Sequence, residues 1–179
     1  MAAAPLSGCR LTTKVDSSML TSLMPTIYVQ LSPERLTVRN AKTGEAISEV
    51  PEIAITQDPK PAIVGIGTEA RSHESIPTVK VVNPFAHPRT LVSDFAVGEQ
   101  LLKAFLRRLQ GRSIFAISPR VVMHPLGDPA GGFTQIEVRA LREMAMGAGA
   151  ARVVVWQGRE LSDQELLSGK FPSGGHVLS

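Results

Sequence analysis

Three short runs of alternating apolar and polar residues follow the first 25 residues of the chain. They cover 27–31, 36–38 and a longer run that ends at 53–55, with turn-forming residues at 32–34 and 42–44. A period of two is typical of half-buried β-strands. Because tight turns join neighbouring runs, the pattern predicts an antiparallel meander of three strands.

The next stretch is rich in residues that favour loops. Residues 57–61 read Gln-Asp-Pro-Lys-Pro, and two β-rich runs at 62–67 and 79–82 are separated by a polar segment. Clusters of Pro, Gly and Asp interrupt regular structure. The sequence therefore predicts a small insertion at about 57–90.

After Pro88 the apolar spacing becomes helical. Ser93 or Asp94 can cap a helix over 94–110, whose apolar residues form one stripe. Thr134 and Glu137 have the spacing of a capping box that opens a second helix, which ends near Gly147. The remaining predicted elements are strands at 113–123, interrupted by Pro119, and at 152–156, and a short helix at 161–167.

The order is therefore three antiparallel strands, an insertion, and then helix, strand, helix, strand, helix. Parallel strands joined by crossover helices predict an α/β fold with a mixed sheet, the ribonuclease-H-like layout that nucleases, sugar kinases and actins share. We place this domain at 26–168. Residues 1–25 show no sustained period and residues 169–179 contain Gly and Ser, so they are predicted to be a flexible leader and a flexible tail.

Composition excludes several classes of function. The chain of 179 residues has a net charge of only +3, and aromatic residues make up 4%. A nucleic-acid partner is not expected, because such proteins need basic patches and stacking side chains. No membrane span is expected either, because no window approaches the ~18 apolar residues that a spanning helix needs. The single cysteine, Cys9, cannot form an internal disulfide, which favours a reducing, cytoplasmic location.

Metal chemistry has little support in the sequence. A nuclease of this layout needs carboxylates on the first strand, the first helix and the end of the fourth strand. The first strand has none, and Asp94, Glu99 and Asp128 fit a helix cap, an exposed helix charge and a turn residue better. We therefore expect no metal site and no nuclease activity.

Histidines and glycines give weak signals. The spacing of the four histidines fits no zinc site, and only His124, before Pro125 at a strand end, could be a ligand or a base. A capped or solvated histidine is the favoured interpretation. The glycine-rich segment 127–132 leads into a helix start that could attract an anion, but it lacks the Lys-Ser/Thr pair of a Walker loop, so a plain connection is favoured.

The second helix carries a family resemblance. Residues 134–143, TQIEVRALRE, followed by GAGA at 147–150, resemble the corresponding stretch of the bacterial actin homologue MreB, the rod-shape-determining protein family. Residues 50–55, 64–70 and 92–97 resemble its strand, turn and first-helix segments in the same order. The resemblance spans roughly 26–168 and implies the first lobe of an actin-like ATPase fold, with its small inserted subdomain.

The resemblance implies ATP with Mg²⁺ as the family ligand, but its motifs are altered here. Tyr28-Val29-Gln30-Leu31 stands where the first phosphate loop, Asp-Leu-Gly-Thr, is expected, and Trp156-Gln157-Gly158-Arg159 replaces a Glu-Glu-Pro segment. Glu137 matches the glutamate that positions the attacking water, although its place in the capping box favours a structural role. We therefore expect neither a bound cofactor nor ATPase activity.

These residues support two hypotheses. The first is a stand-alone, truncated MreB-like domain that acts as a structural or protein-interaction module in cell-shape determination. Its partners would be proteins of that machinery or further copies of the chain. The alternative is a nucleotide-handling actin-superfamily lobe that a partner chain completes.

Overall fold

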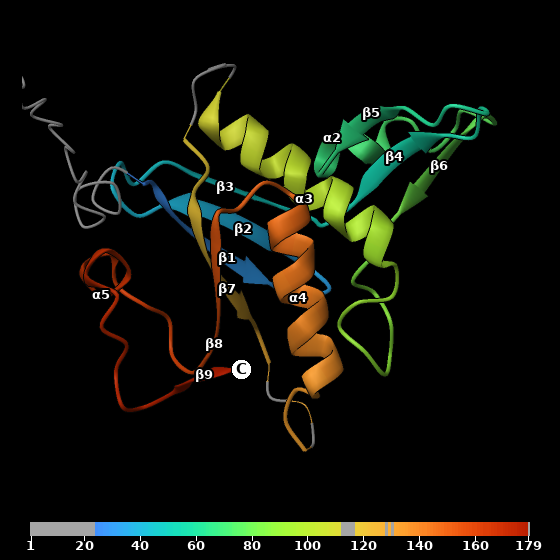
Figure 1. Ribbon diagram of the computed structural model, residues 1–179. Helices are drawn as coiled ribbons and strands as arrows, with labels where there is room; N and C mark the ends of the chain where they lie inside the picture. The colour runs from blue at the N-terminus through green and yellow to red at the C-terminus, as the bar shows by residue number, and fades with distance from the viewer. Residues whose placement is uncertain (1–23, 112–116, 128, 130, 179) are drawn as a thin grey trace, which may run out of the picture.

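A six-stranded mixed sheet lies at the centre of the computed structural model, which describes residues 24–111, 117–127, 129 and 131–178 (Figure 1). The strand order is β3-β2-β1-β7-β8-β9. β1, β2 and β3 pair antiparallel, while β7 pairs parallel with both β1 and β8. This arrangement confirms the predicted α/β fold with a mixed sheet. The bounds are Thr26–Leu31 for β1, Leu36–Asn40 for β2, Ala46–Glu49 for β3, Arg120–Pro125 for β7, Arg152–Gln157 for β8 and His176–Leu178 for β9.

Helices cover both faces of this sheet. α3 (Phe95–Gln110) and α4 (Gln135–Gly147) pack against one face, and the short α5 (Asp163–Ser168) packs against the other (Figure 1). Asp94 caps α3, because its carboxylate accepts a hydrogen bond from the Val97 N–H at 3.0 Å. Capping boxes open both α4 and α5. The predicted helices are therefore confirmed.

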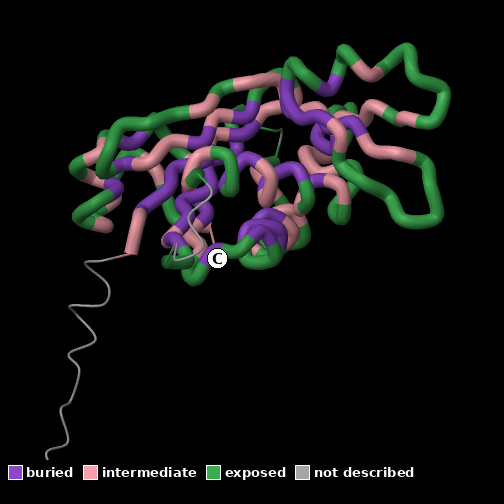
Figure 2. Tube along the Cα trace, turned by 90° about the horizontal axis from the view of Figure 1, so that it is seen from above, coloured by how far each residue is buried: buried purple, intermediate pink, exposed green. Residues whose placement is uncertain are grey.

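Two apolar clusters hold these layers together. Under α3 and α4, the α3 stripe of Leu101, Leu102, Phe105 and Leu106 is at most 2% exposed. Each such side chain stabilises the fold by about 1.5–3 kcal/mol when fully buried. The second cluster, on the α5 face, contains Tyr28, Trp156 and Leu166. Figure 2 shows the buried segments gathered in the main sheet and its helices, with exposed loops at the outer end of the insertion.

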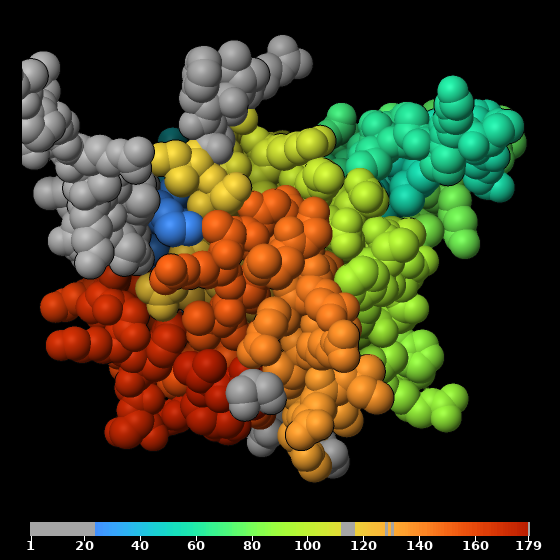
Figure 3. All heavy atoms as spheres, in the orientation of Figure 1, coloured from blue at the N-terminus to red at the C-terminus, as the bar shows by residue number. Residues whose placement is uncertain are grey.

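The insertion is a second, three-stranded sheet with the order β5-β4-β6. It projects from one side of the main body (Figure 3). Its elements are β4 (Ile53–Thr56), β5 (Ile63–Ile66), α2 (Thr68–Arg71) and β6 (Val79–Val82).

The prediction that the third meander strand ends at 53–55 is wrong. The third strand is β3, and residues 53–56 are the central strand of the second sheet. Pro51 lies between the two strands, where a residue without an N–H cannot continue a ladder. The second sheet therefore begins before residue 57, the start predicted for the insertion.

The prediction of a flexible tail at 169–179 is also wrong for most of that segment. β9 pairs antiparallel with β8, and the Leu178 carbonyl accepts a hydrogen bond from Arg142 at 3.1 Å. Phe171 stacks on Trp156 with ring centroids 5.3 Å apart. Local composition suggested mobility, but pairing with a distant strand and contact with a buried indole order this segment.

Some predictions fall outside the described residues. The predicted leader at 1–25 lies there except for Met24 and Pro25, as do positions 113–116 of the predicted strand 113–123. No helix among the described residues is long and apolar enough to span a membrane.

Candidate functional site

The carboxyl ends of β1 and β7 lie side by side at one edge of the main sheet. These strands are parallel, Leu31 is registered with Pro125, and the Leu126 N–H donates a hydrogen bond to the Leu31 carbonyl at 2.7 Å. In open α/β sheets, ligands bind outside the carboxyl ends of the strands. This edge is therefore the candidate functional site.

The backbone amide groups of the turn that follows β1 form hydrogen bonds within the turn itself. The hydroxyl oxygen of Ser32 accepts hydrogen bonds from the N–H of Arg35 at 3.1 Å and of Glu34 at 3.3 Å. The Ser32 N–H donates to the Arg35 carbonyl at 2.9 Å. A phosphate cradle needs free backbone N–H groups, and these three are already bonded.

An open hollow of about 480 Å³ lies beside this turn, with Glu137 at its wall. Its lining is largely apolar and includes Leu91, Leu126 and Phe133. Arg89 is the one arginine or lysine among the described residues that line it, and His87 lies beside it. The hollow is larger than a water site, but the described lining offers a phosphate little beyond Arg89.

Glu137 has hydrogen-bond donors on both carboxylate oxygens. Oε2 accepts from the Thr134 N–H at 3.0 Å and the Thr134 hydroxyl at 2.9 Å. Oε1 accepts from the Thr90 hydroxyl at 3.2 Å and the Leu91 N–H at 3.4 Å. Burial alone would raise the pKa of Glu137, but these hydrogen bonds together lower it below its ordinary value. The capping box that the sequence predicted is confirmed, and the carboxylate also ties α4 to the segment that returns from the insertion.

Nothing in the sequence indicated that Thr90 and Leu91 contact Glu137. They lie 47 and 46 residues away along the chain. The hydroxyl of Thr90 was the one hint in the sequence, and the other threonines of the chain carry the same group.

Tyr28 of β1 and His124 of β7 form a buried pair on the face of the main sheet that α5 covers. The Tyr28 hydroxyl bonds His124 Nδ1 and accepts from the Leu161 N–H at 3.2 Å. His124 Nε2 is 3.0 Å from the Gly158 carbonyl, so Nε2 donates and Nδ1 accepts from Tyr28. His124 is 4% exposed and all its polar atoms are used, so it is a satisfied buried histidine.

Burial governs the titration of this pair. It raises the pKa of Tyr28 to about 12 and lowers the pKa of His124 below its usual value, despite the Gly158 carbonyl and Glu160, which act to raise it. Both groups are therefore neutral at pH 7.

Two of the other carboxylate candidates, Asp94 and Glu99, make structural contacts on α3. Asp94 is the cap of α3, and Glu99 lies against Gly147 of α4. Asp128 lies outside the described residues. Among the residues that the structure places, no group of three or more His, Cys, Asp and Glu side chains could hold a metal ion.

Comparison with known proteins decides the family. The sequence model of the MreB/Mbl protein family matches residues 26–161. The chain belongs to this family. Cell shape-determining protein MreB of Escherichia coli K12 is 32% identical over 117 residues, which are 62% of this chain and 31% of that protein. MreB of Haemophilus influenzae is also 32% identical, over 120 residues. The chain thus spans about a third of the length of the MreB relatives it matches.

Solved structures confirm the actin-like fold. MreB5 of Spiroplasma citri bound to AMPPNP superposes with a TM-score of 0.58 at 19% identity, covering 74% of this chain and 38% of that one. A non-polymerising MamK mutant bound to AMPPNP gives a TM-score of 0.60 at 15% identity, covering 75% and 41%. The partial coverage fits the predicted resemblance to the first lobe of the family.

Proposed function

We propose that this MreB-type domain does not hydrolyse ATP and acts in the cytoplasm as a structural or protein-interaction module of the cell-shape machinery. The hydrogen bonds within the turn that follows β1 are the observation that carries this proposal. Phosphoryl transfer needs a phosphate cradle and a positioned water. The Ser32 hydroxyl already occupies the N–H groups of Glu34 and Arg35, which a cradle would have to leave free.

The environment of Glu137 supports the same proposal. A carboxylate offers about four lone-pair sites, and four donors from Thr134, Thr90 and Leu91 surround this one. A water-positioning role would require Glu137 to give up bonds that cap α4 and hold the returning segment.

The interaction role is supported by what the relatives do. The matched proteins are named as cell shape-determining proteins, and one solved MamK structure, with a TM-score of 0.53, is a double helical filament. We extend protein association to this chain, with cell-shape proteins or further copies of itself as partners.

Calorimetric titration with ATP and Mg²⁺, combined with a phosphate-release assay, tests the absence of hydrolysis. We expect no saturable heat up to about 1 mM ATP, a range in which a functional site would be filled. We also expect the same background release for the wild type and for Glu137→Gln. A full-length MreB that hydrolyses ATP is the positive control. Micromolar binding, with phosphate release that the Glu137→Gln substitution abolishes, would contradict the proposal.

One observation favours the alternative of a nucleotide-handling lobe completed by a partner. The hollow beside Glu137 is open, and Arg89 could meet a phosphate there. This candidate predicts that ATP binds after a full-length MreB that cannot itself bind nucleotide is added, and that Arg89→Gln prevents it. Titrations that stay flat with the added protein would remove this candidate.

A further inference from the structure

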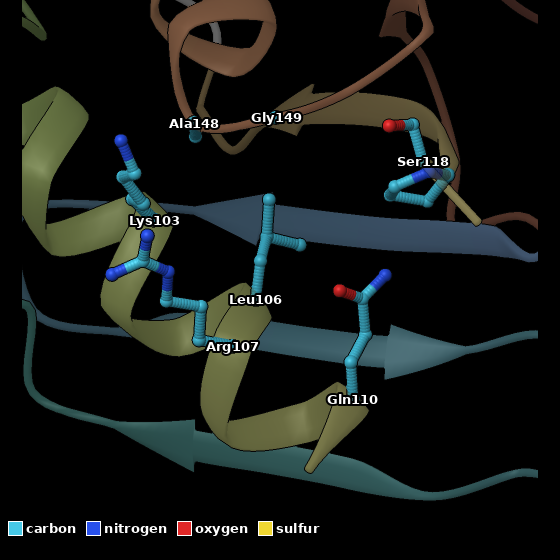
Figure 4. A pocket seen from close by; sticks show the side chains of 8 residues that line it. Lys103, Leu106, Arg107, Gln110, Ser118, Ala148 and Gly149 are labelled. Atoms are coloured by element: carbon cyan, nitrogen blue, oxygen red, sulfur yellow. The ribbon is translucent and has the colours of Figure 1, made fainter. Parts of the chain in front are cut away.

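A second pocket, of about 330 Å³, opens at the opposite edge of the main sheet, near the amino end of β7. It lies between the last turns of α3, the residues before β7 and the end of α4 (Figure 4). The lining residues that matter here are Lys103, Leu106, Arg107, Gln110, Ser118 and Pro119. The family resemblance assigned no role to any of them.

Lys103, Arg107, Gln110 and Ser118 give this pocket several hydrogen-bond donors. Lys103 and Arg107, one helical turn apart on α3, form no ion pair with any acidic residue that the structure describes. The Gln110 side-chain nitrogen is buried and has no hydrogen-bond partner among the described residues. Buried polar groups are nearly always hydrogen-bonded. This nitrogen has almost no accessible surface, so an acceptor in the pocket would bond it only after the Gln110 side chain turns toward the pocket.

The donors are divided between two sides of an apolar floor. Figure 4 shows Lys103 and Arg107 on one side of Leu106, and Gln110 and Ser118 on the other. A ligand that uses both sides must therefore be extended, with negative charge at one end, neutral acceptors at the other and an apolar part between them.

Electrostatics favours a carboxylate over a phosphate. Both α3 and α4 end at this pocket, since Gln110 is the last residue of α3 and Ala148 is the C-cap of α4. The carbonyl groups at helix C-termini carry partial negative charge. They disfavour a doubly charged phosphate more than a singly charged carboxylate, which Lys103 and Arg107 can balance.

We propose that this pocket binds an acidic peptide segment of a protein partner. A Glu or Asp side chain of the peptide pairs with Lys103 and Arg107, and a peptide carbonyl accepts from Gln110 and Ser118. An aliphatic side chain of the peptide lies on Leu106 and Pro119. This inference rests on the proposed role as an interaction module and gives that role a surface and a partner chemistry.

Fluorescence polarisation with the labelled octapeptide Glu-Glu-Leu-Leu-Glu-Glu-Leu-Leu tests the proposal, because residues two apart share one face of an extended chain and this repeat therefore places Glu and Leu on the same face. We expect saturable binding to the wild type, and binding about tenfold weaker to the double variant Lys103→Gln/Arg107→Gln, because two charge-assisted contacts are lost. The double variant Lys60→Gln/Lys80→Gln is the matched control. It removes the same charge from exposed positions, Lys60 in the loop between β4 and β5 and Lys80 on β6, and should bind within about twofold of the wild type.

The peptide with Gln in place of Glu should also bind about tenfold more weakly. Charge reversal gives a sharper test: Lys103→Glu/Arg107→Glu should lose the acidic peptide and bind its Lys-Leu counterpart. Absence of saturable binding up to about 1 mM peptide would overturn the proposal. Equal affinity of the wild type and Lys103→Gln/Arg107→Gln, or displacement of the peptide by inorganic phosphate at about 10 mM, would also overturn it.

These outcomes are independent of ATP hydrolysis. Phosphate release by a chain that also binds the acidic peptide would contradict only the absence of ATPase activity. Failure of peptide binding by a chain that is inert toward ATP would contradict only the assignment of this pocket.

Discussion

At the scale of single residues, hydrogen-bond partners decide what Glu137 and His124 can do. Glu137 has the residue type and the position of a catalytic glutamate, yet Thr134, Thr90 and Leu91 surround its carboxylate. His124 lies at a strand end, where a base could lie, yet Tyr28 and Gly158 use both ring nitrogens. Residue type and sequence position suggested chemistry for both side chains, and the structure shows both of them in hydrogen bonds that stabilise the fold.

His124 should make the stability of the fold depend on pH. Burial lowers its pKa in the folded state, whereas in the unfolded chain the imidazole has a pKa of about 6.5. As the pH falls below that value, the unfolded state binds a proton that the folded state still excludes, so the free energy of unfolding decreases until the folded pKa is reached. Urea unfolding at about pH 7.5 and about pH 5.5 should show a larger loss for the wild type than for His124→Gln.

Tyr28→Phe is the control for this measurement. It removes the hydroxyl that bonds His124 but keeps the titrating imidazole, so the excess loss at low pH should remain. Identical pH dependence in the wild type and His124→Gln would contradict the assignment of the effect to His124.

At the scale of elements, local signals and distant contacts specify different parts of the structure. The α3 cap at Asp94 and the capping box of α4 are short-range patterns, and the sequence predicted both. β4 and β9 depend on partners elsewhere in the chain, and the sequence placed the first in the wrong sheet and missed the second. Strand pairing is a long-range property that composition within a window does not report.

Phe171 tests whether the segment after α5 stabilises the fold. Trp156 is 1% exposed, and Phe171 stacks on its indole. Phe171→Ala should lower the free energy of unfolding by about 1–2 kcal/mol, because a partly buried ring and its stacking contact are lost. It should also shift Trp156 fluorescence to the red. Leu167→Ala on α5 is the control, since Leu167 is 50% exposed and should change stability by less than about 0.5 kcal/mol. An unchanged spectrum and midpoint for Phe171→Ala would mean that the tail is not docked.

At the scale of the whole molecule, the two sheets share one core. Ile53 and Ile66 of the second sheet belong to the same buried cluster as Phe105 of α3. Glu49 at the end of β3 adds a polar link, because its carboxylate accepts from the Thr68 N–H of α2 at 2.7 Å. A shared core couples the insertion to the main body.

The described domain should therefore unfold in a single transition. Circular dichroism, which reports all elements, and the fluorescence of Trp156 in the main sheet should give the same urea midpoint. Ile66→Ala should lower the free energy of unfolding by about 2–3 kcal/mol. Both urea midpoints should therefore fall together. A variant that shifts the dichroism transition but leaves the fluorescence transition in place would show that the insertion unfolds independently.

The fold class, the helix caps and the family resemblance could be predicted from the amino-acid sequence alone. They depend on patterns among residues close together in the chain. Examples are the apolar stripe of α3, the spacing of Thr134 and Glu137, and the residues at 134–150 that carry the resemblance. The resemblance also implies that Tyr28-Val29-Gln30-Leu31 stands where the family has a phosphate loop, because a motif is a property of consecutive residues.

The surroundings of those residues became visible only in the folded molecule. The bonds from Thr90 and Leu91 to Glu137, the Tyr28–His124 pair and the pocket between Lys103 and Ser118 each join residues far apart along the chain or in different elements. Their meeting depends on how the sheet and the helices pack, and hydrogen bonding and burial then set the chemistry that each side chain can perform.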